Sequence, residues 1–73
     1  MEDFPRITIE ADKMGGAPCI RGYRMPVATV LNLLGNGWTR SQILEDWPWM
    51  ENEDIDEALR YGASLATPRN VAV

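Results

Sequence analysis

Apolar and polar residues alternate over residues 6–10, and this alternation predicts a short β-strand with Ile7 and Ile9 on one face. A second extended piece is expected at residues 18–20, after a turn that contains two consecutive glycines. A ribbon of two strands is marginal in water by itself, and its open edges favour pairing with another chain. This region therefore indicates a dimer or a heteromeric partner.

Beyond residue 26 the spacing of apolar residues changes to that of an amphipathic helix. Apolar side chains recur at positions i, i+3, i+4 and i+7, namely Val27, Val30, Leu31 and Leu34. This stripe predicts a helix over residues 27–35. Pro26 lies close to its first turn, and a glycine is available for a left-handed cap at its end.

A second helix has the clearest start signal in the chain. Thr39 and Gln42 have the spacing of a capping box, and Trp38 is placed to pack on Ile43 at the helix start. Because the residue before a proline is disfavoured in a helix, Pro48 ends this helix near residue 46 or 47.

The third helix is expected to begin near Glu51 or Asn52 and to continue to about residue 66. Its apolar stripe repeats the helical spacing at Ile55, Ala58, Leu59 and Gly62. A glycine inside a helix costs about 1 kcal/mol relative to alanine. Gly62 therefore indicates the close approach of another helix.

Together these elements predict a mainly α fold, a three-helix homeodomain-like or helix-turn-helix bundle preceded by a short β-strand or hairpin region. We expect one domain overall. Its amino-terminal strand region and arginine loop cover residues 1–26, its helices cover residues 27–66, and a carboxy-terminal tail covers residues 67–73.

The composition of the 73 residues excludes much familiar enzyme chemistry. The chain has no histidine and one cysteine, Cys19, which removes disulfide frameworks, Cys/His zinc sites and Ser-His-Asp triads. We therefore expect no enzyme, no cofactor and no metal site. No apolar run is long enough to span a bilayer, so the sequence favours a soluble, cytoplasmic protein without membrane contact.

Charge is unevenly distributed along the chain, whose net charge is −4. Residues 41–66 carry seven acidic residues against Arg60 alone, whereas residues 1–40 are weakly basic. An acidic domain is repelled on average by nucleic acid, so a nucleic-acid partner would require a local basic patch.

Residues 16–27, here called the arginine loop, are the segment that core packing explains least. Arg21 and Arg24 stand three apart with Gly22 between them, and prolines stiffen both ends. A guanidinium held on such a loop can offer two parallel hydrogen bonds to a carboxylate or phosphate. An equally weighted alternative is that these arginines cap helices or pair with acids of the second half of the chain.

At this point the sequence resembles a known family. Over roughly residues 5–65, three motifs are similar to those of the prokaryotic domain of unknown function 433. They are Gly16-x-Pro18-Cys19-Ile20-Arg21-Gly22-x-Arg24-x-Pro26-Val27, then Ile43-Leu44-Glu45-Asp46-x-Pro48, and then Glu53-Asp54-Ile55-x-x-Ala58-Leu59. Tyr23 departs from the usual small residue, Ala17 from the usual lysine, and residues 51–52 from the usual helix start. The resemblance implies a VapB-like antitoxin paired with a PIN-like ribonuclease toxin.

The resemblance also implies a mechanism. PIN-like nucleases bind metal with clustered carboxylates, so an arginine entering that cluster would neutralise it and block RNA. We expect a homodimer or a higher heteromer with the toxin. The expected partner-binding residues are Arg21, Arg24, Tyr23, Trp47 and Trp49.

Trp47 and Trp49 flank Pro48 and leave two possibilities open. In the first, the two rings form an apolar contact patch together with Met25 and Met50, because exposed aromatic residues mark protein contacts. Alternatively, their rings cover the bottom of the helical bundle.

The alternative function is repression of the protein's own operon through operator DNA. If the second helix reads DNA, the contacts come from Thr39, Arg40, Ser41 and Gln42. If the third helix reads DNA, it would turn exposed acids towards the phosphates, namely Glu53, Asp54, Asp56 and Glu57. That second orientation is electrostatically unfavourable.

Overall fold

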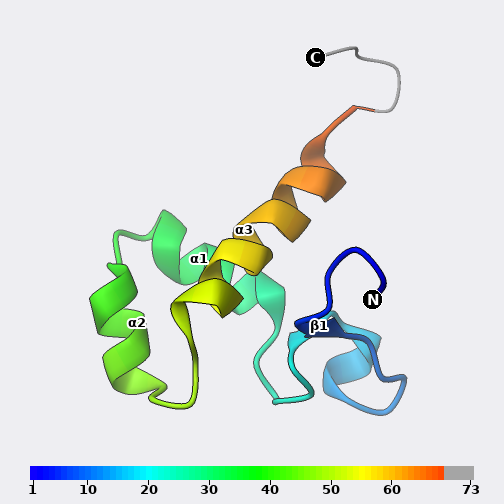
Figure 1. Cartoon of the computed structure of the whole chain (residues 1–73), viewed down its shortest axis with the longest axis horizontal. Helices are drawn as coiled ribbons and strands as arrows, with labels where there is room; N and C mark the ends of the chain where they lie inside the picture. The colour runs from blue at the N-terminus through cyan, green and yellow to red at the C-terminus, as the bar shows by residue number, and fades with distance from the viewer. Residues whose placement is uncertain (69–73) are drawn as a thin grey trace.

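The computed structural model describes residues 1–68 and confirms the mainly α fold. Its elements are β1 (Ile7–Thr8), the 3-10 turn η1 (Met14–Gly16), β2 (Cys19–Ile20), α1 (Val27–Gly35), α2 (Arg40–Asp46) and α3 (Asn52–Ala66) (Figure 1). α3 ends where the expected tail begins, and the part of that tail over residues 69–73 lies outside the described residues. Within residues 1–68, every helix is too short or too polar to cross a lipid bilayer.

The two strands pair antiparallel, with Ile7 opposite Ile20 and Thr8 opposite Cys19. Pairing stops at Thr8, so Ile9 lies outside the ladder and is 51% exposed. The prediction that Ile9 shares a face with Ile7 is therefore wrong. It fails because two paired residues are too few to extend the alternation of side chains.

Both outer edges of this small sheet are occupied by the chain itself. On the β1 side, the Ile7 N–H donates to the Phe4 carbonyl at 3.0 Å, and the terminal ammonium donates to the Ile7 carbonyl at 3.0 Å. On the β2 side, the Ile20 N–H donates to the Met25 carbonyl at 2.9 Å. The paired residues therefore have no need of a strand from a partner.

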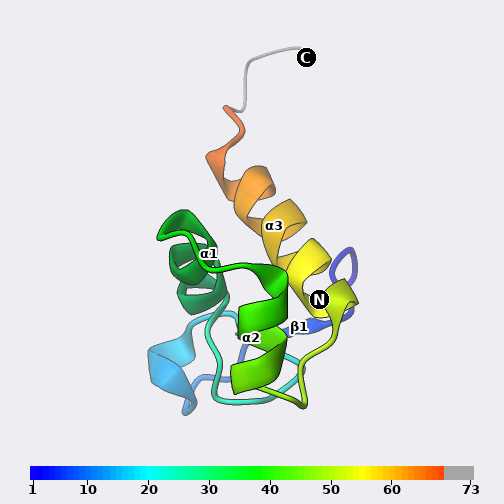
Figure 2. The same cartoon turned by 90° about the vertical axis from the view of Figure 1, so that its left-hand side faces the viewer.

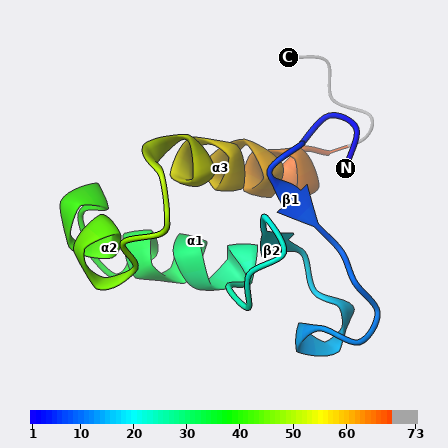
Figure 3. The same ribbon diagram turned by 60° about the horizontal axis from the view of Figure 1, so that its bottom comes forward.

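α1 and α3 lie side by side, while α2 packs across one end of the pair (Figures 2 and 3). A Cβ placed on Gly62 would come within 2.8 Å of the Leu31 Cδ1 atom, which confirms the predicted close helix approach. Beneath this contact is one core that joins strands and helices, including Ile7, Ile20, Val30, Ile43, Ile55 and Ala58.

The start of α2 is as predicted. The Gln42 N–H donates to the Thr39 hydroxyl at 3.1 Å, and the Thr39 N–H donates to the Gln42 side-chain oxygen at 2.8 Å. Trp38 packs against the core cluster that contains Ile43. This capping box is a local feature and needs no long-range contact to form.

Candidate functional site

The tip of the arginine loop, residues 21–24, is fixed to the strand region through its backbone. The Arg21 N–H donates to the Arg6 carbonyl at 2.7 Å, and the Gly22 N–H donates to the Thr8 hydroxyl at 2.9 Å. Because these bonds hold the main chain, the tip has a defined conformation before any partner arrives.

Two consecutive residues of the tip have left-handed backbone, Arg21 with φ 42° and Gly22 with φ 75°. Glycine adopts this conformation freely, whereas a residue with a side chain loses on the order of 1 kcal/mol there. The Lys13 ammonium donates to the Gly22 carbonyl and helps to close the turn. The cost at Arg21 must be offset by contacts of its side chain.

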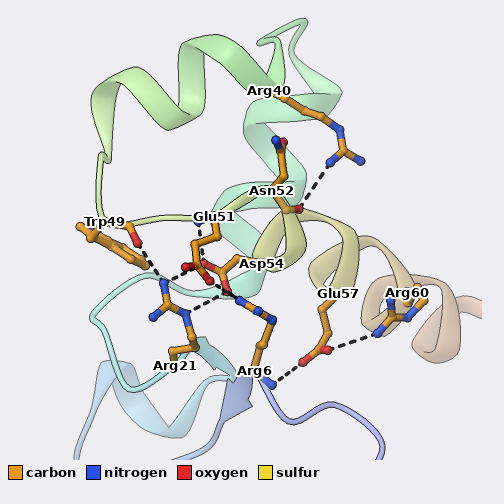
Figure 4. A network of polar contacts seen from close by, with 9 residues as sticks. All are labelled: Arg6, Arg21, Arg40, Trp49, Glu51, Asn52, Asp54, Glu57 and Arg60. Carbon is orange, nitrogen blue, oxygen red and sulfur yellow. Dashed lines mark hydrogen bonds and ion pairs between the residues drawn. The ribbon is translucent and has the colours of Figure 1, made fainter.

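Those contacts are made to Asp54, in the first turn of α3. Nε and Nη2 of Arg21 each bind one Asp54 carboxylate oxygen at 3.0 Å, which is the two-pronged geometry of an arginine–carboxylate pair (Figure 4). Arg6 Nη1 binds the same carboxylate at 3.0 Å, and the Glu51 N–H donates to it at 2.8 Å. The Asp54 side chain is 0% exposed, so this carboxylate is a buried hub for four donors.

Burial by itself would raise the pKa of Asp54, since it disfavours the charged form. The hydrogen bonds from Arg21, from the Glu51 backbone and from Arg6 outweigh burial and lower the pKa of Asp54 below its usual value. The hydrogen bond to Asp54 raises the pKa of Arg21 in turn. The Asp54 carboxylate and the guanidinium groups of Arg21 and Arg6 therefore remain charged at neutral pH.

This lowered pKa predicts a loss of stability in acid. The Asp54 contribution to the free energy of unfolding is fully present above the unfolded-state pKa of about 3.9, and it is lost as the pH falls through the lower folded-state value. We expect urea denaturation to give a steeper stability loss below pH 4 in the wild type than in an Asp54→Asn variant. Parallel pH profiles for the two proteins would contradict this assignment.

Arg21 is thus turned inward, which corrects the expectation that both arginines project from the loop. Of the two alternatives for Arg21, pairing with an acid of the second half of the chain is what the structure shows. Its Nη2 also donates to the Trp49 carbonyl at 2.9 Å, which joins the loop to the segment before α3 (Figure 4). The physical reason is that a buried carboxylate requires a cation, and Arg21 supplies it.

Two stacked aromatic rings lie next to the Arg21 guanidinium. The Tyr23 and Trp49 rings stack with centroids 3.8 Å apart and planes 10° apart, and the Arg21 Cζ lies 5.4 Å and 5.9 Å from their respective centroids. Such cation–π contacts add to the ion pair. Tyr23 nevertheless remains 41% exposed, so part of it is accessible from solvent.

Arg24 is the arginine that projects. Its side chain is exposed, and within residues 1–68 it makes no ion pair. We call Tyr23, Arg24 and Trp49 the tip surface, which combines the exposed Arg24 with the stacked pair of its sequence neighbour Tyr23 and Trp49.

Trp47 does not join this surface. It lies near Trp38, with ring centroids 6.1 Å apart, and both rings pack against the core. Met25 and Met50 are buried, each at 5% exposure, so the patch of two tryptophans and two methionines does not form. Both Trp47 and Trp49 therefore follow the alternative of packing against the bundle, and Trp49 also stacks on Tyr23.

The residues expected to read DNA from the second helix are largely engaged within the chain. Thr39 and Gln42 cap α2, and Arg40 Nη2 pairs with Asp56 at 2.7 Å, while Ser41 is exposed. This geometry does not favour α2 as a reading helix.

The expectation of four exposed acids on the third helix is wrong for Asp54 and Glu57, which are buried. Glu57 accepts hydrogen bonds from the Arg6 N–H and from Arg60 Nη2. The sequence does contain a signal, because Asp54 precedes Ala58 by four positions and Tyr61 by seven, on the buried stripe. In the part of the chain that the structure describes, no three His, Cys, Asp or Glu side chains group as metal ligands.

The chain is similar to known proteins in sequence and fold. The model of a family described as proteins of unknown function (DUF433) matches residues 7–62. The uncharacterized protein y4eO of Sinorhizobium fredii (strain NBRC 101917 / NGR234) is 36% identical over 55 residues, which are 75% of this chain and 25% of that protein. A crystal structure of a DUF433 member protein from Anabaena variabilis ATCC 29413 superimposes with TM-score 0.78 and 29% identity, over 81% of this chain and 58% of that one. The chain thus spans about a quarter of the length of this curated relative and somewhat over half of the solved one.

Proposed function

The chain belongs to the DUF433 family, and from this premise we propose that it is the antitoxin of a type II toxin–antitoxin pair, which binds and inhibits a PIN-like ribonuclease. The observation that carries the proposal is the tip surface, where Arg24 stands uncommitted on an ordered loop. An acidic nuclease centre needs a cation to neutralise it, and the chain offers one on a loop whose backbone is hydrogen-bonded in place.

Arg24 takes the role that the sequence suggested for both arginines. Its guanidinium donates to the metal-binding carboxylates of the ribonuclease, in the two-pronged geometry that arginine makes with carboxylates. The exposed face of Tyr23 packs beside that contact and excludes water from it. Because the backbone of the tip is already ordered, little conformational entropy is lost on binding.

In this proposal the chain acts without catalysis or a cofactor, and the complex forms in the cytoplasm, where the ribonuclease meets its RNA. Arg21 supports the surface from behind and does not enter the nuclease. Trp49 contributes by stacking on Tyr23. Trp47 lies outside the contact.

The test is the Arg24→Ala variant, assayed for inhibition of a PIN-like ribonuclease whose gene neighbours that of this protein. We expect the inhibition constant for RNA cleavage to rise about 30-fold or more, as for a central arginine of an interface. Arg40→Ala is the matched control, since Arg40 is a partly exposed arginine on α2 that pairs with Asp56. It should inhibit like the wild type.

Equal inhibition by Arg24→Ala and the wild type would refute the proposed plug. The operator-binding alternative gives a different result. It requires that the chain alone shift promoter DNA in a gel, with a steep dependence on salt, and that RNA cleavage be unaffected.

A further inference from the structure

The peptide group between Gly22 and Tyr23 leads the chain from the turn of the tip towards Arg24. Its N–H, which belongs to Tyr23, donates to the Ile20 carbonyl at 2.8 Å and closes the turn. Its carbonyl, which belongs to Gly22, accepts a hydrogen bond from the Lys13 ammonium. Both ends of this peptide group are therefore held, and its orientation sets the direction in which the chain continues.

The bond from Lys13 acts at the residue of the tip whose backbone is least restricted. Gly22 has φ 75°, and glycine adopts positive and negative φ about equally readily, so the peptide group that follows it rotates easily. A charged donor makes a stronger hydrogen bond than a neutral one. Lys13 therefore restrains the tip where the chain itself restrains it least.

Lys13 is itself fixed by the segment that carries it. Its N–H donates to the Glu10 carbonyl at 3.0 Å, its carbonyl accepts from the Gly16 N–H at 2.9 Å, and its ammonium pairs with the Glu10 carboxylate at 2.9 Å. This segment enters η1, which lies on the side of the strand pair away from α3 (Figures 1 and 3). The tip is thus held from two directions, by Arg21 to α3 and by Lys13 to the η1 segment.

The backbone of η1 is unusual. Met14, Gly15 and Gly16 are three consecutive residues with left-handed backbone, at φ 50°, 67° and 81°. A methionine is disfavoured in this conformation, and the Met14 side chain is 43% exposed, so core packing does not explain it. Such positions persist where the surrounding structure determines them, and they concentrate in functional segments. The bond from Lys13 to the tip gives this turn a role.

We propose that Lys13 is a positioning residue for Arg24. Its ammonium fixes the peptide group that leads into Tyr23 and Arg24, so the Arg24 guanidinium is presented to the ribonuclease from one direction. Lys13 does not touch the ribonuclease. A tip that is restrained before binding loses less conformational entropy on binding. The effect on inhibition rests on the proposed function, whereas the restraint of the tip by Lys13 does not.

The Lys13→Met variant tests the proposal, since methionine removes the ammonium and retains most of the stem. We expect hydrogen exchange at the Tyr23 N–H to speed up about tenfold in the free protein, and the inhibition constant for the ribonuclease to rise about fivefold. The urea midpoint should stay close to that of the wild type, because the pair of Lys13 with Glu10 is partly exposed. Lys13→Arg keeps a charged donor and should restore most of both losses.

Glu10→Gln is the matched control. It removes the charge that pairs with Lys13 but leaves the bond to the Gly22 carbonyl, so exchange and inhibition should match the wild type. Unchanged exchange at Tyr23 in Lys13→Met would overturn the restraint, and faster exchange with unchanged inhibition would overturn the positioning role. The exchange measurement uses no ribonuclease. Failure of the proposed function, seen as equal inhibition by Arg24→Ala and the wild type, is therefore distinguishable from failure of this inference.

Discussion

Replacing Asp54 by alanine is expected to lower the free energy of unfolding by about 4 kcal/mol. Removing one member of a buried ion pair typically costs about 3 to 5 kcal/mol, and part of that loss here is the capping bond to the Glu51 N–H, which is worth about 1 kcal/mol. Arg21 and Arg6 would lose their shared carboxylate. Since both arginine side chains are about one-third exposed, water takes over part of their solvation and limits the loss.

Urea denaturation at pH 7 measures this effect. A small domain has a stability of only about 5 kcal/mol, so the alanine variant is close to unfolded. Asp54→Asn keeps the shape and one acceptor oxygen, and it should lose about 2 kcal/mol and remain measurable.

Asp56→Ala is the matched control, an aspartate of the same helix that pairs with Arg40 at 2.7 Å but is half exposed. An exposed pair contributes about 0 to 1 kcal/mol. If the Asp54 and Asp56 variants lose similar stability, the buried hub is not what holds the loop to α3.

The helices were predictable because their signals are local. The capping box of Thr39 and Gln42, the stop at Pro48 and the stripe from Val27 to Leu34 each depend on residues within two turns of one another. The role of Gly62 was also predictable. A glycine inside a helix costs about 1 kcal/mol relative to alanine, so its presence indicated the close approach of another helix, which the structure shows.

The orientation of Arg21 was not predictable in this way. Its partner Asp54 lies 33 positions away, and the left-handed backbone at Arg21 has no local sequence signal comparable to that of glycine. Acidic residues at a helix start are explained by the helix dipole alone, which concealed the burial of Asp54 and Glu57. Two arginines that look equivalent along the chain therefore have opposite orientations in space.

Arg21→Ala is expected to weaken inhibition of the ribonuclease about tenfold, although Arg21 does not touch the partner in the proposed complex. Without its guanidinium the tip loses the connection to Asp54 and to the Trp49 carbonyl. If the tip becomes ordered only on binding, the conformational entropy that it loses lowers the affinity for the ribonuclease. A tenfold loss of affinity corresponds to about 1.4 kcal/mol. Stability should fall by about 2 kcal/mol, because Asp54 keeps Arg6 and the Glu51 N–H as donors.

A lower folded fraction alone would also weaken inhibition, so the positioning role needs its own measurement. Hydrogen exchange at the Gly22 N–H, which is bonded to Thr8 in the wild type, should speed up while the core of α3 stays protected. Arg21→Lys retains the charge without the two-pronged geometry. Its inhibition constant and its exchange rate at Gly22 should therefore lie between those of the wild type and Arg21→Ala. Arg40→Ala, which removes only the surface pair with half-exposed Asp56, should match the wild type in both assays. If Arg21→Ala weakens inhibition only as much as its unfolded fraction requires, Arg21 stabilises the fold without positioning Arg24.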